Sequence, residues 1–332
     1  MNDDSSLQVP AQSIPIPRSL SRQARAYMVR ATQTLYERGV VGKTNAASSE
    51  QSAQAAAALE FLRPVAMSFR GREECIELAG GARLYCMIPE SCDGRFAEVA
   101  FFDIHGGGFC SGGGELCQVL ARVRAAEYGA AVFAIDYRLL PDFAYPCALD
   151  DCIAGYREIL SRYAPQNLVV GGFSAGANLA AAMLLRGRDE GLSLPAALVL
   201  QTPVLDMLRS GDSYRTNRFV DVNLYGGTDD LSDQYVGEAD PAHPYISPLY
   251  GDFSKGWPPT ILTSGSRDLL LSDTLRMHRY LRRAGVAAEL HVMEAGSHGG
   301  FLGIAPEDME IADECRRFTY AAWCVGDWCV GD

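Results

Sequence analysis

The sequence has no cluster of lysine and arginine long enough to follow a phosphate backbone, and its 41 acidic residues against 29 basic ones give a net charge of −12. A surface that is negative overall repels the phosphates of DNA and RNA. We therefore expect no nucleic-acid partner. The sequence also lacks an apolar run of about 20 residues, the length that spans a bilayer as a helix. We expect no membrane partner either.

The first 17 residues lack the basic stretch and following apolar run that mark a secretory signal, and they are acidic and interrupted by proline instead. We therefore expect a cytoplasmic protein. Ten cysteines are scattered along the chain without a C-x-x-C pair, so we expect free thiols that serve as small apolar side chains. Because His and Cys show no ligand spacing, we expect no metal and no cofactor.

Hydrophobic residues make up 48% of the chain and charged residues 21%, which is typical of globular rather than disordered proteins. Two helices are expected before the first strand. Apolar residues recur at intervals of three and four in residues 19–38. A second helix is expected from near residue 46 through the alanine-rich residues 51–61, with Pro64 ending it. We expect residues 1–73 to form an N-terminal helical lid segment.

From residue 74 onward the pattern changes to short strands. Residues 74–79 and 83–88 flank Gly80-Gly81 and predict a hairpin. Short apolar runs follow, separated mostly by helical stretches, at residues 99–104, 130–135, 168–173, 196–200, 260–263 and 289–293. Buried strands that alternate with helices are typical of a mostly parallel sheet covered on both faces. We expect an α/β catalytic domain over residues 74–332.

One segment of this domain breaks the alternation. Residues 207–259 are polar and rich in Gly, Asp and Pro, and they are longer than an ordinary connection between strands. We expect them to form a second piece of lid, inserted between two strands.

The residues Gly172-Phe173-Ser174-Ala175-Gly176 follow a predicted strand and precede a predicted helix. They fit the G-x-S-x-G nucleophile elbow, in which the serine sits on a strained turn and its Oγ projects. Glycines allow the close backbone passes that such a turn needs. Taken alone, the pattern fits an ordinary glycine-rich turn equally well.

A second glycine-rich loop, His-Gly-Gly-Gly-Phe at residues 105–109, directly follows the predicted strand 99–104. Successive glycines allow two amides to point at one place, and each such donor contributes about 2.7–4 kcal/mol to an oxyanion transition state. The alternatives are a flexible loop and a phosphate-binding turn. The latter lacks its Lys-Ser/Thr pattern here.

His298 is the candidate general base, because it alone among five histidines lies in a loop after a strand and downstream of Ser174. The candidate acid is Asp268, which leaves the strand before His298, in the chain order Ser, acid, His. Asp268 has an alternative role as a helix cap. Asp273 is the rival acid, but Ser272 as N-cap and the helix dipole already explain it. The sequence therefore predicts the triad Ser174, His298 and Asp268.

On these motifs the chain resembles the hormone-sensitive-lipase family of esterases, the microbial family IV, from about residue 74 to 318. The resemblance rests on residues 105–109, 172–176, the neighbourhoods of Asp268 and His298, and Asp-Tyr-Arg-Leu-Leu-Pro at 136–141, which is close to the family's DYRLAPE. It implies the α/β-hydrolase fold and a structural role for residues 136–141. It also implies an oxyanion hole made by the amides of Gly107, Gly108 and Ala175.

The chain departs from the family pattern without losing a catalytic group. Phe173 and Ala177 replace Asp and Gly of the common GDSAGG elbow, Asp142 stands where Glu is usual, and a second glycine follows His298. The GFSAG elbow and residues 264–273 look most like the branch of monoterpene ε-lactone hydrolases, which makes lactones candidate substrates. The resemblance further implies a homodimer formed through the edge of the last strand.

The expected function is hydrolysis of small carboxylic esters with a short acyl chain, through an acyl-enzyme intermediate. Lactone hydrolysis and amide hydrolysis or deacetylation are alternatives, because the triad alone does not choose the leaving group. A non-catalytic, receptor-like binding protein is a third alternative, since related folds keep the pocket without the histidine. The presence of His298 argues against it.

Overall fold

The structure is a computed structural model that describes residues 13–41 and 48–324. Its centre is an eight-stranded sheet in the order β1-β2-β4-β3-β5-β6-β7-β8. The first two strands run antiparallel to their neighbours, and the others pair in parallel. The strands are β1 (Gly71–Glu77), β2 (Arg83–Pro89), β3 (Ala100–Ile104), β4 (Ala131–Asp136), β5 (Leu168–Phe173), β6 (Ala197–Gln201), β7 (Thr260–Gly265) and β8 (Ala288–Met293).

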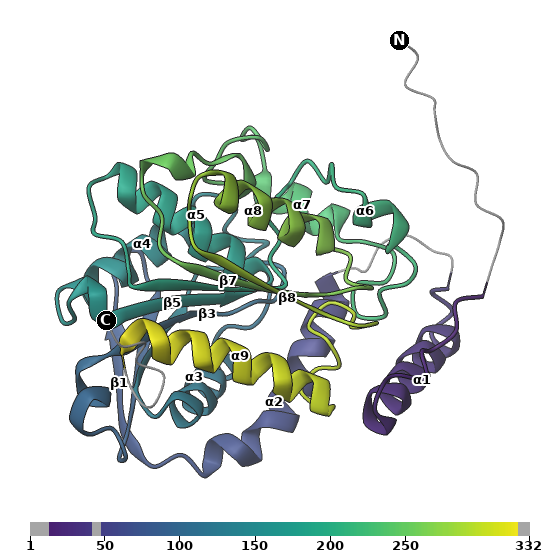
Figure 1. Ribbon diagram of the computed structural model, residues 1–332, viewed down its shortest axis with the longest axis horizontal. Coiled ribbons are helices and arrows are strands. Elements are labelled where there is room, and N and C mark those ends of the chain that lie inside the picture. The colour runs from purple at the N-terminus through teal and green to yellow at the C-terminus, as the bar shows by residue number, and fades with distance from the viewer. Residues whose placement is uncertain (1–12, 42–47, 325–332) are drawn as a thin grey trace.

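Helices cover both faces of the sheet (Figure 1). In this view α4, α5 and α8 lie above the sheet, and α2, α3 and α9 lie below it. The α-helices are α1 (Arg22–Glu37), α2 (Ser48–Met67), α3 (Glu115–Tyr128), α4 (Cys147–Leu160), α5 (Ala175–Asp189), α6 (Ser213–Thr216), α7 (Asp229–Val236), α8 (Leu271–Arg283) and α9 (Pro306–Trp323). The short 3₁₀ helices are η1 (Gly94–Glu98), η2 (Pro165–Asn167), η3 (Pro248–Tyr250) and η4 (Phe253–Lys255).

The predicted strands and the α/β fold are confirmed. The hairpin pairs β1 with β2, and Gly80 and Gly81 turn the chain with φ of +92° and +91°, which glycine adopts without strain. Every residue of β3 and β7 is buried. Burial from both faces explains why these strands read as continuous apolar runs.

The direction of the parallel strands gathers the candidate site. The glycine-rich loop follows β3, Ser174 follows β5, Asp268 follows β7 and His298 follows β8. Because the carboxyl ends of parallel strands meet at one edge of the sheet, these residues come together there. The insertion between β6 and β7, which contains α6 and α7, lies at the same edge.

Helix α1 packs against the part of the chain that carries His298. Ala24 and Met28 of α1 belong to an apolar cluster with Met293 and Phe301, on either side of the His298 loop. The backbone amide and hydroxyl of Ser21 both donate hydrogen bonds to the carboxylate of Glu307, at 2.7 and 2.8 Å. The N-terminal helix is therefore anchored beside the candidate site.

Two expectations about helix ends were wrong. Pro64 does not end α2 but lies inside it, one turn before its end. A proline removes a single amide hydrogen bond from the helix, and packing of α2 against α3 keeps the last turn helical. Helix α8 begins at Leu271, so Ser272 is not its N-cap, and the Ser272 hydroxyl accepts the amide of Ser213 at 2.9 Å instead.

One expectation lies outside the described residues, namely the start of the second helix near residue 46. Within the described residues, no helix is both long and apolar enough to cross a membrane.

Candidate active site

Ser174 lies on the turn between β5 and α5, with φ +55° and ψ −117°, a backbone conformation that residues other than glycine rarely adopt. The neighbouring glycines make the turn possible. A Cβ on Gly172 would lie 2.3 Å from the carbonyl oxygen of Gly176, and a Cβ on Gly176 would lie 1.9 Å from that of Ile104. The turn therefore has the strained geometry of a nucleophile elbow, and its serine is only half-buried.

The glycine-rich loop after β3 leaves amides free beside the serine. Gly107, Gly108 and Phe109 all have positive φ, at +115°, +59° and +62°. No group in the described part of the chain accepts a hydrogen bond from the amides of Gly107 and Gly108. The amide of Ala175 is in the first turn of α5 and has no acceptor within that helix. All three residues line the cavity above Ser174, so their amides are available to a ligand.

His105, the first residue of this loop, supports it. Its ring stacks on Tyr137 at 4.2 Å, and the Tyr137 hydroxyl donates to the His105 carbonyl at 2.9 Å. Burial lowers the pKa of His105, so its ring is neutral at physiological pH. His105 therefore holds the loop and does not lie in the Ser174 hydrogen-bond chain.

The three residues of the predicted triad lie together. His298 Nε2 is 2.9 Å from Ser174 Oγ, and His298 Nδ1 is 3.2 Å from Asp268 Oδ1. Asp268 is fully buried and accepts two further hydrogen bonds, from the Ser264 hydroxyl at 2.8 Å and the Leu270 amide at 2.9 Å. These contacts orient the carboxylate, which in turn orients the imidazole ring.

The rival acid, Asp273, lies in α8 and makes other contacts. Its Oδ2 accepts the amides of Leu205 and Asp206, at 2.7 and 3.0 Å, and the hydroxyl of Tyr214 at 2.8 Å. Burial raises the pKa of Asp273 to about 7. The expectation that it merely complements the helix dipole was incomplete, because it is a fully buried group that ties the insertion to α8.

His298 is held in a negative environment. Burial alone would lower its pKa, but the charge and hydrogen bond of Asp268, together with the charge of Asp221, outweigh burial and raise it. The two carboxylates therefore stabilise the imidazolium that forms when the neutral His298 ring accepts a proton.

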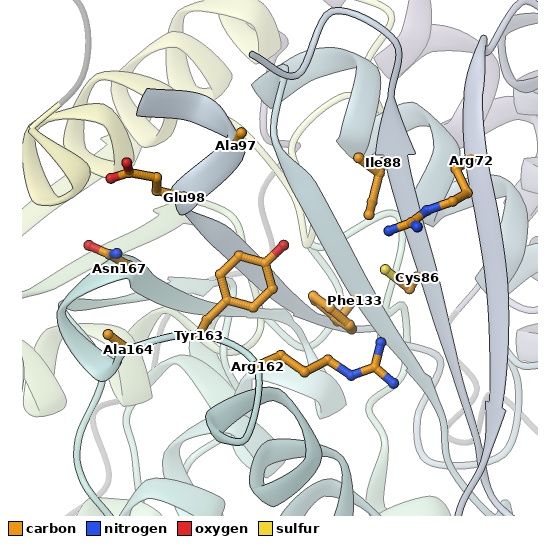
Figure 2. Close-up of a pocket in the computed structure, with 10 residues that line it drawn as sticks. All are labelled: Arg72, Cys86, Ile88, Ala97, Glu98, Phe133, Arg162, Tyr163, Ala164 and Asn167. Atoms are coloured by element: carbon orange, nitrogen blue, oxygen red, sulfur yellow. The ribbon is translucent and has the colours of Figure 1, made fainter. Parts of the chain in front are cut away.

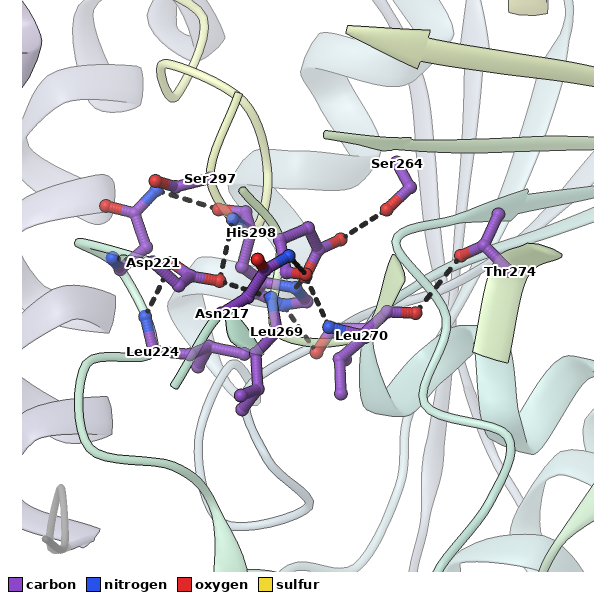
Figure 3. Close-up of polar contacts among 12 residues, drawn as sticks. Asn217, Asp221, Leu224, Ser264, Leu269, Leu270, Thr274, Ser297 and His298 are labelled. Carbon is purple, nitrogen blue, oxygen red and sulfur yellow. Dashed lines mark hydrogen bonds and ion pairs between the residues drawn. The ribbon is translucent and has the colours of Figure 1, made fainter. Parts of the chain in front are cut away.

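The sequence reasoning missed a group of polar residues in the insertion, at positions 217–223. They lie against the loops that carry Asp268 and His298 (Figure 3). Asp221 is fully buried there and contacts the backbone of both loops. A polar segment without periodicity gives no signal for contacts with distant loops. Its Asp and Asn, two residues apart, indicate only a local turn.

A cavity of about 790 Å³ lies over Ser174. Its wall includes apolar residues of α2 and α3 and residues of the insertion, namely Ala58, Phe61, Leu62, Leu116, Leu120, Leu224, Thr228 and Leu231. Asp103 and Arg124 also line it, and their side chains lie 3.8 Å apart. The cavity is therefore mostly apolar, with a charged pair in one wall.

A smaller cavity of about 390 Å³ lies near the amino-terminal ends of β3 and β5 (Figure 2). Burial raises the pKa of its Cys86 to about 11, so this cysteine is a thiol and not a thiolate at neutral pH. Its Arg162 is paired with Glu74 and Glu158, at 3.2 and 2.8 Å. Its lining residues do not pair a nucleophile with a base, so the larger cavity is the candidate active site.

Among the described residues, one group of side chains has the composition of a metal site. The ligand atoms of Glu289, His291 and Glu314 lie within 4.8 Å of one another, on β8 and α9. Arg317 forms ion pairs with both glutamates, at 2.8 Å to Glu314. An arginine of the chain therefore already binds both carboxylates, and we assign this group no metal.

Comparisons with known proteins agree with this geometry. Residues 101–302 match a family model described as the alpha/beta hydrolase fold. The chain is 35% identical to an acetyl-hydrolase of Streptomyces hygroscopicus over 201 residues, which cover 59% of this chain and 65% of that protein. It is 31% identical to an esterase of Acinetobacter venetianus over 193 residues, 57% of this chain and 63% of that one. The matches thus span slightly less than two thirds of these two enzymes.

Solved structures match over nearly the whole chain. The esterase E25 has a TM-score of 0.81 and 31% identity, and the match covers 95% of this chain and 98% of that one. An esterase from the bacterial hormone-sensitive lipase family has a TM-score of 0.76 and 26% identity, with coverage of 90% and 98%.

Proposed function

Because this chain belongs to the α/β-hydrolase fold family, and within it to the esterases of hormone-sensitive-lipase type, we propose that it hydrolyses short-chain carboxylic esters with Ser174 as nucleophile. The observation that carries the proposal is the chain of contacts from Ser174 Oγ to His298 Nε2 at 2.9 Å and from His298 Nδ1 to Asp268 at 3.2 Å. Nucleophile, base and orienting acid then act as a unit.

In the proposed reaction, Oγ of Ser174 attacks the ester carbonyl carbon while His298 Nε2 takes the hydroxyl proton. The carbonyl oxygen becomes an oxyanion, and the amides of Gly107, Gly108 and Ala175 donate to it. The tetrahedral intermediate collapses, the C–O bond to the alcohol breaks, and the imidazolium gives its proton to the leaving alcohol. Water then attacks the carbonyl carbon of the acyl-enzyme while His298 takes a proton from it. The bond between this carbon and Ser174 Oγ breaks, His298 returns the proton to Oγ, and the carboxylic acid leaves.

We propose that the substrate is small and mostly apolar around the reacting carbonyl. Apolar residues of α2 and α3 in the cavity wall support this proposal. The Asp103–Arg124 pair supports a short acyl chain, because a long alkyl chain over this largely buried pair would remove the part of it that is still exposed from water. A lactone is a cyclic ester that the same triad would open, so lactones belong in the substrate screen. Amide substrates test the alternative leaving group.

We propose that residues 1–73 and 207–259 form a two-part lid over the catalytic domain of residues 74–332. Support comes from the cavity wall, to which both α2 and the insertion contribute. Further support comes from α1, whose Tyr27 hydroxyl donates a hydrogen bond to Asn223 of the insertion. Substrate would then reach Ser174 between the two parts.

We further propose a homodimer formed through the free edge of β8, and a cytoplasmic location. The first is supported by the position of β8 at the end of the sheet, where β7 is its single partner among the described strands. The second is supported by the nine described cysteines, all of which are free thiols. Light scattering of the purified protein tests the dimer, and cell fractionation tests the location.

The experiment that tests the enzymatic proposal compares wild type, Ser174→Ala and Ser161→Ala on p-nitrophenyl esters. We expect Ser174→Ala to fold normally and to lower turnover by about 10⁴- to 10⁶-fold, because triad members act as a unit. Ser161 is exposed and its hydroxyl caps the end of α4, so Ser161→Ala is the matched control and should leave the rate unchanged. Phenylmethylsulfonyl fluoride should modify wild type once and should not modify Ser174→Ala. Activity of Ser174→Ala within tenfold of wild type would remove the assignment.

A further inference from the structure

The insertion between β6 and β7 places a second buried carboxylate beside the triad. Asp221 is fully buried, and its Oδ2 accepts the amides of His298 at 3.1 Å and Leu269 at 2.8 Å. Its Oδ1 accepts the amides of Asn223 at 2.8 Å and Leu224 at 3.0 Å. One carboxylate therefore joins the backbone of three segments, which are the insertion, the Asp268 loop and the His298 loop (Figure 3).

Neighbours of Asp221 strengthen the same connection. The Val222 amide donates to the hydroxyl of Ser297 at 3.2 Å, and the Asn223 side-chain amide donates to the carbonyl of His298 at 2.7 Å. The backbone of His298 is thus held on both sides, through its own amide and its own carbonyl. Because the backbone at His298 is fixed, the imidazole cannot be displaced from its place between Ser174 and Asp268 by a shift of the loop.

The charge of Asp221 has no basic partner, since none of the ion pairs in the described part of the chain includes it. The titratable groups around it are Asp268, His298 and Tyr27 of α1. Burial, together with the charge of Asp268, raises the pKa of Asp221 to about 6. Such a carboxylate is still mostly ionised at pH 7 and above, where it favours a positive charge on His298.

An aspartate that only stabilises a local turn needs neither burial nor hydrogen bonds to other segments. Asp240 accepts the amide of Ala242 at 2.9 Å, and Asp252 accepts that of Ser254 at 3.0 Å, in two turns of the same insertion. Both aspartates are exposed, and among the described residues their carboxylates bond only within their own turns. Asp221 makes the same local turn but is buried and also bonds to two catalytic loops.

We propose, on the basis of the function proposed above, that Asp221 is a positioning residue that clamps the backbone of His298 to the Asp268 loop. The clamp keeps the imidazole within hydrogen-bond distance of both Ser174 and Asp268. Asp221 itself does not touch the ring or the substrate. Catalysis depends on such alignment, because a displacement of about 1 Å costs about 10²-fold in rate.

The test compares Asp221→Asn with Asp240→Asn in the full chain. Both substitutions keep the shape of the side chain and remove one negative charge from the insertion. In Asp221→Asn an NH₂ group replaces one oxygen and faces amide donors, so one pair of hydrogen bonds is lost. We measure kcat and KM on p-nitrophenyl butyrate from pH 5 to 9, and the rate at which phenylmethylsulfonyl fluoride modifies Ser174.

For Asp221→Asn we expect kcat to fall by about 10- to 100-fold, the loss seen when a carboxylate that supports a metal-bound histidine is removed, with KM within about threefold. The acidic limb of the pH profile should move to lower pH, because His298 loses a negative neighbour. Sulfonylation should slow by a similar factor, and Asp240→Asn should match wild type. Unchanged kcat and an unchanged pH limb in Asp221→Asn, even with a lower Tm, would overturn the proposal.

Two further arms keep the result decisive. Sulfonylation requires an activated serine but no ester turnover, so it tests Asp221 even if the wild-type protein hydrolyses none of the esters and the proposed function fails. If Asp221→Asn does not fold, Ser297→Ala is tested instead. The Ser297→Ala substitution removes only the hydroxyl that accepts the Val222 amide. It should lower kcat by about three- to tenfold without moving the pH limb, and wild-type kcat in this variant would overturn the proposal.

Discussion

Replacing Asp268 by asparagine separates the charge of the proposed triad acid from its shape. Asp268 Oδ1 faces both His298 Nδ1 and the Leu270 amide, and Oδ2 faces the Ser264 hydroxyl. An asparagine can keep its oxygen toward His298, while the Ser264 hydroxyl turns to accept from the new NH₂ group. The main loss is then the negative charge that stabilises the imidazolium in the transition state.

The size of this loss follows from the distance. His298 Nδ1 and Asp268 Oδ1 are 3.2 Å apart, and both side chains are buried. Two unit charges about 4 Å apart interact by about 4 kcal/mol at an effective dielectric constant of about 20. Since about 1.4 kcal/mol corresponds to a tenfold change in rate, we expect Asp268→Asn to lower kcat by about 10³-fold. An asparagine that instead imposed the wrong tautomer would lower kcat by about 10⁴-fold, the loss that this substitution causes in a serine protease triad.

Asp273→Asn is the matched control, because Asp273 follows the same strand and is equally buried. Its pKa of about 7 means that it is partly protonated at neutral pH, so an amide resembles it closely. We expect kcat to change by less than about tenfold. Both variants are assayed with p-nitrophenyl butyrate after circular dichroism confirms folding. A larger loss in Asp273→Asn than in Asp268→Asn would refute the reasoning and transfer the role to Asp273.

The remaining predictions concern pH, substrate and thiols. His298 must be neutral to accept the Ser174 proton, and the nearby carboxylates raise its pKa above the ordinary 6.5. The kcat/KM of the wild type should therefore fall as the pH drops, with a midpoint above pH 6.5. A midpoint below pH 6 would contradict this prediction. Butyryl esters should be hydrolysed faster than palmitoyl esters, because the Asp103–Arg124 pair lines the cavity; the reverse order in a chain-length series would reject the short-chain assignment. All ten cysteines of the chain should react in thiol counting on denatured, unreduced protein, since the nine described ones are free; markedly fewer reactive thiols would contradict this.

The strands and the residues at their ends could be predicted from the sequence for a physical reason. A parallel strand such as β3 or β7 is buried on both faces, so its burial appears directly as an apolar run. The elbow could be predicted because only glycines permit the close passes at positions 172 and 176. Chain order then singled out His298, since the fold places the histidine after the last strand.

The support around the triad could not be predicted in this way. Asp221 and Asn223 lie in a polar insertion, and their contacts with the His298 loop join residues about 75 positions apart. No periodicity encodes such a contact, because it depends on the path of an irregular segment. The expectation that Pro64 ends α2 was wrong for a related reason, since packing against α3 outweighs a local helix-breaking preference.

The meeting of α1, α2 and the insertion at Asn223 has a consequence for protein engineering. The Tyr27 hydroxyl of α1 donates to the side-chain oxygen of Asn223, and the Gln54 side chain of α2 donates to the backbone carbonyl of Asn223 at 3.2 Å. The side-chain amide of Asn223 in turn donates to the carbonyl of His298. Exchanging these segments for those of a relative, in order to change which esters are accepted, would also change the support of the general base. A chimera that keeps residues 217–224 of this chain should retain its turnover, whereas one that replaces them should lose turnover along with its original selectivity.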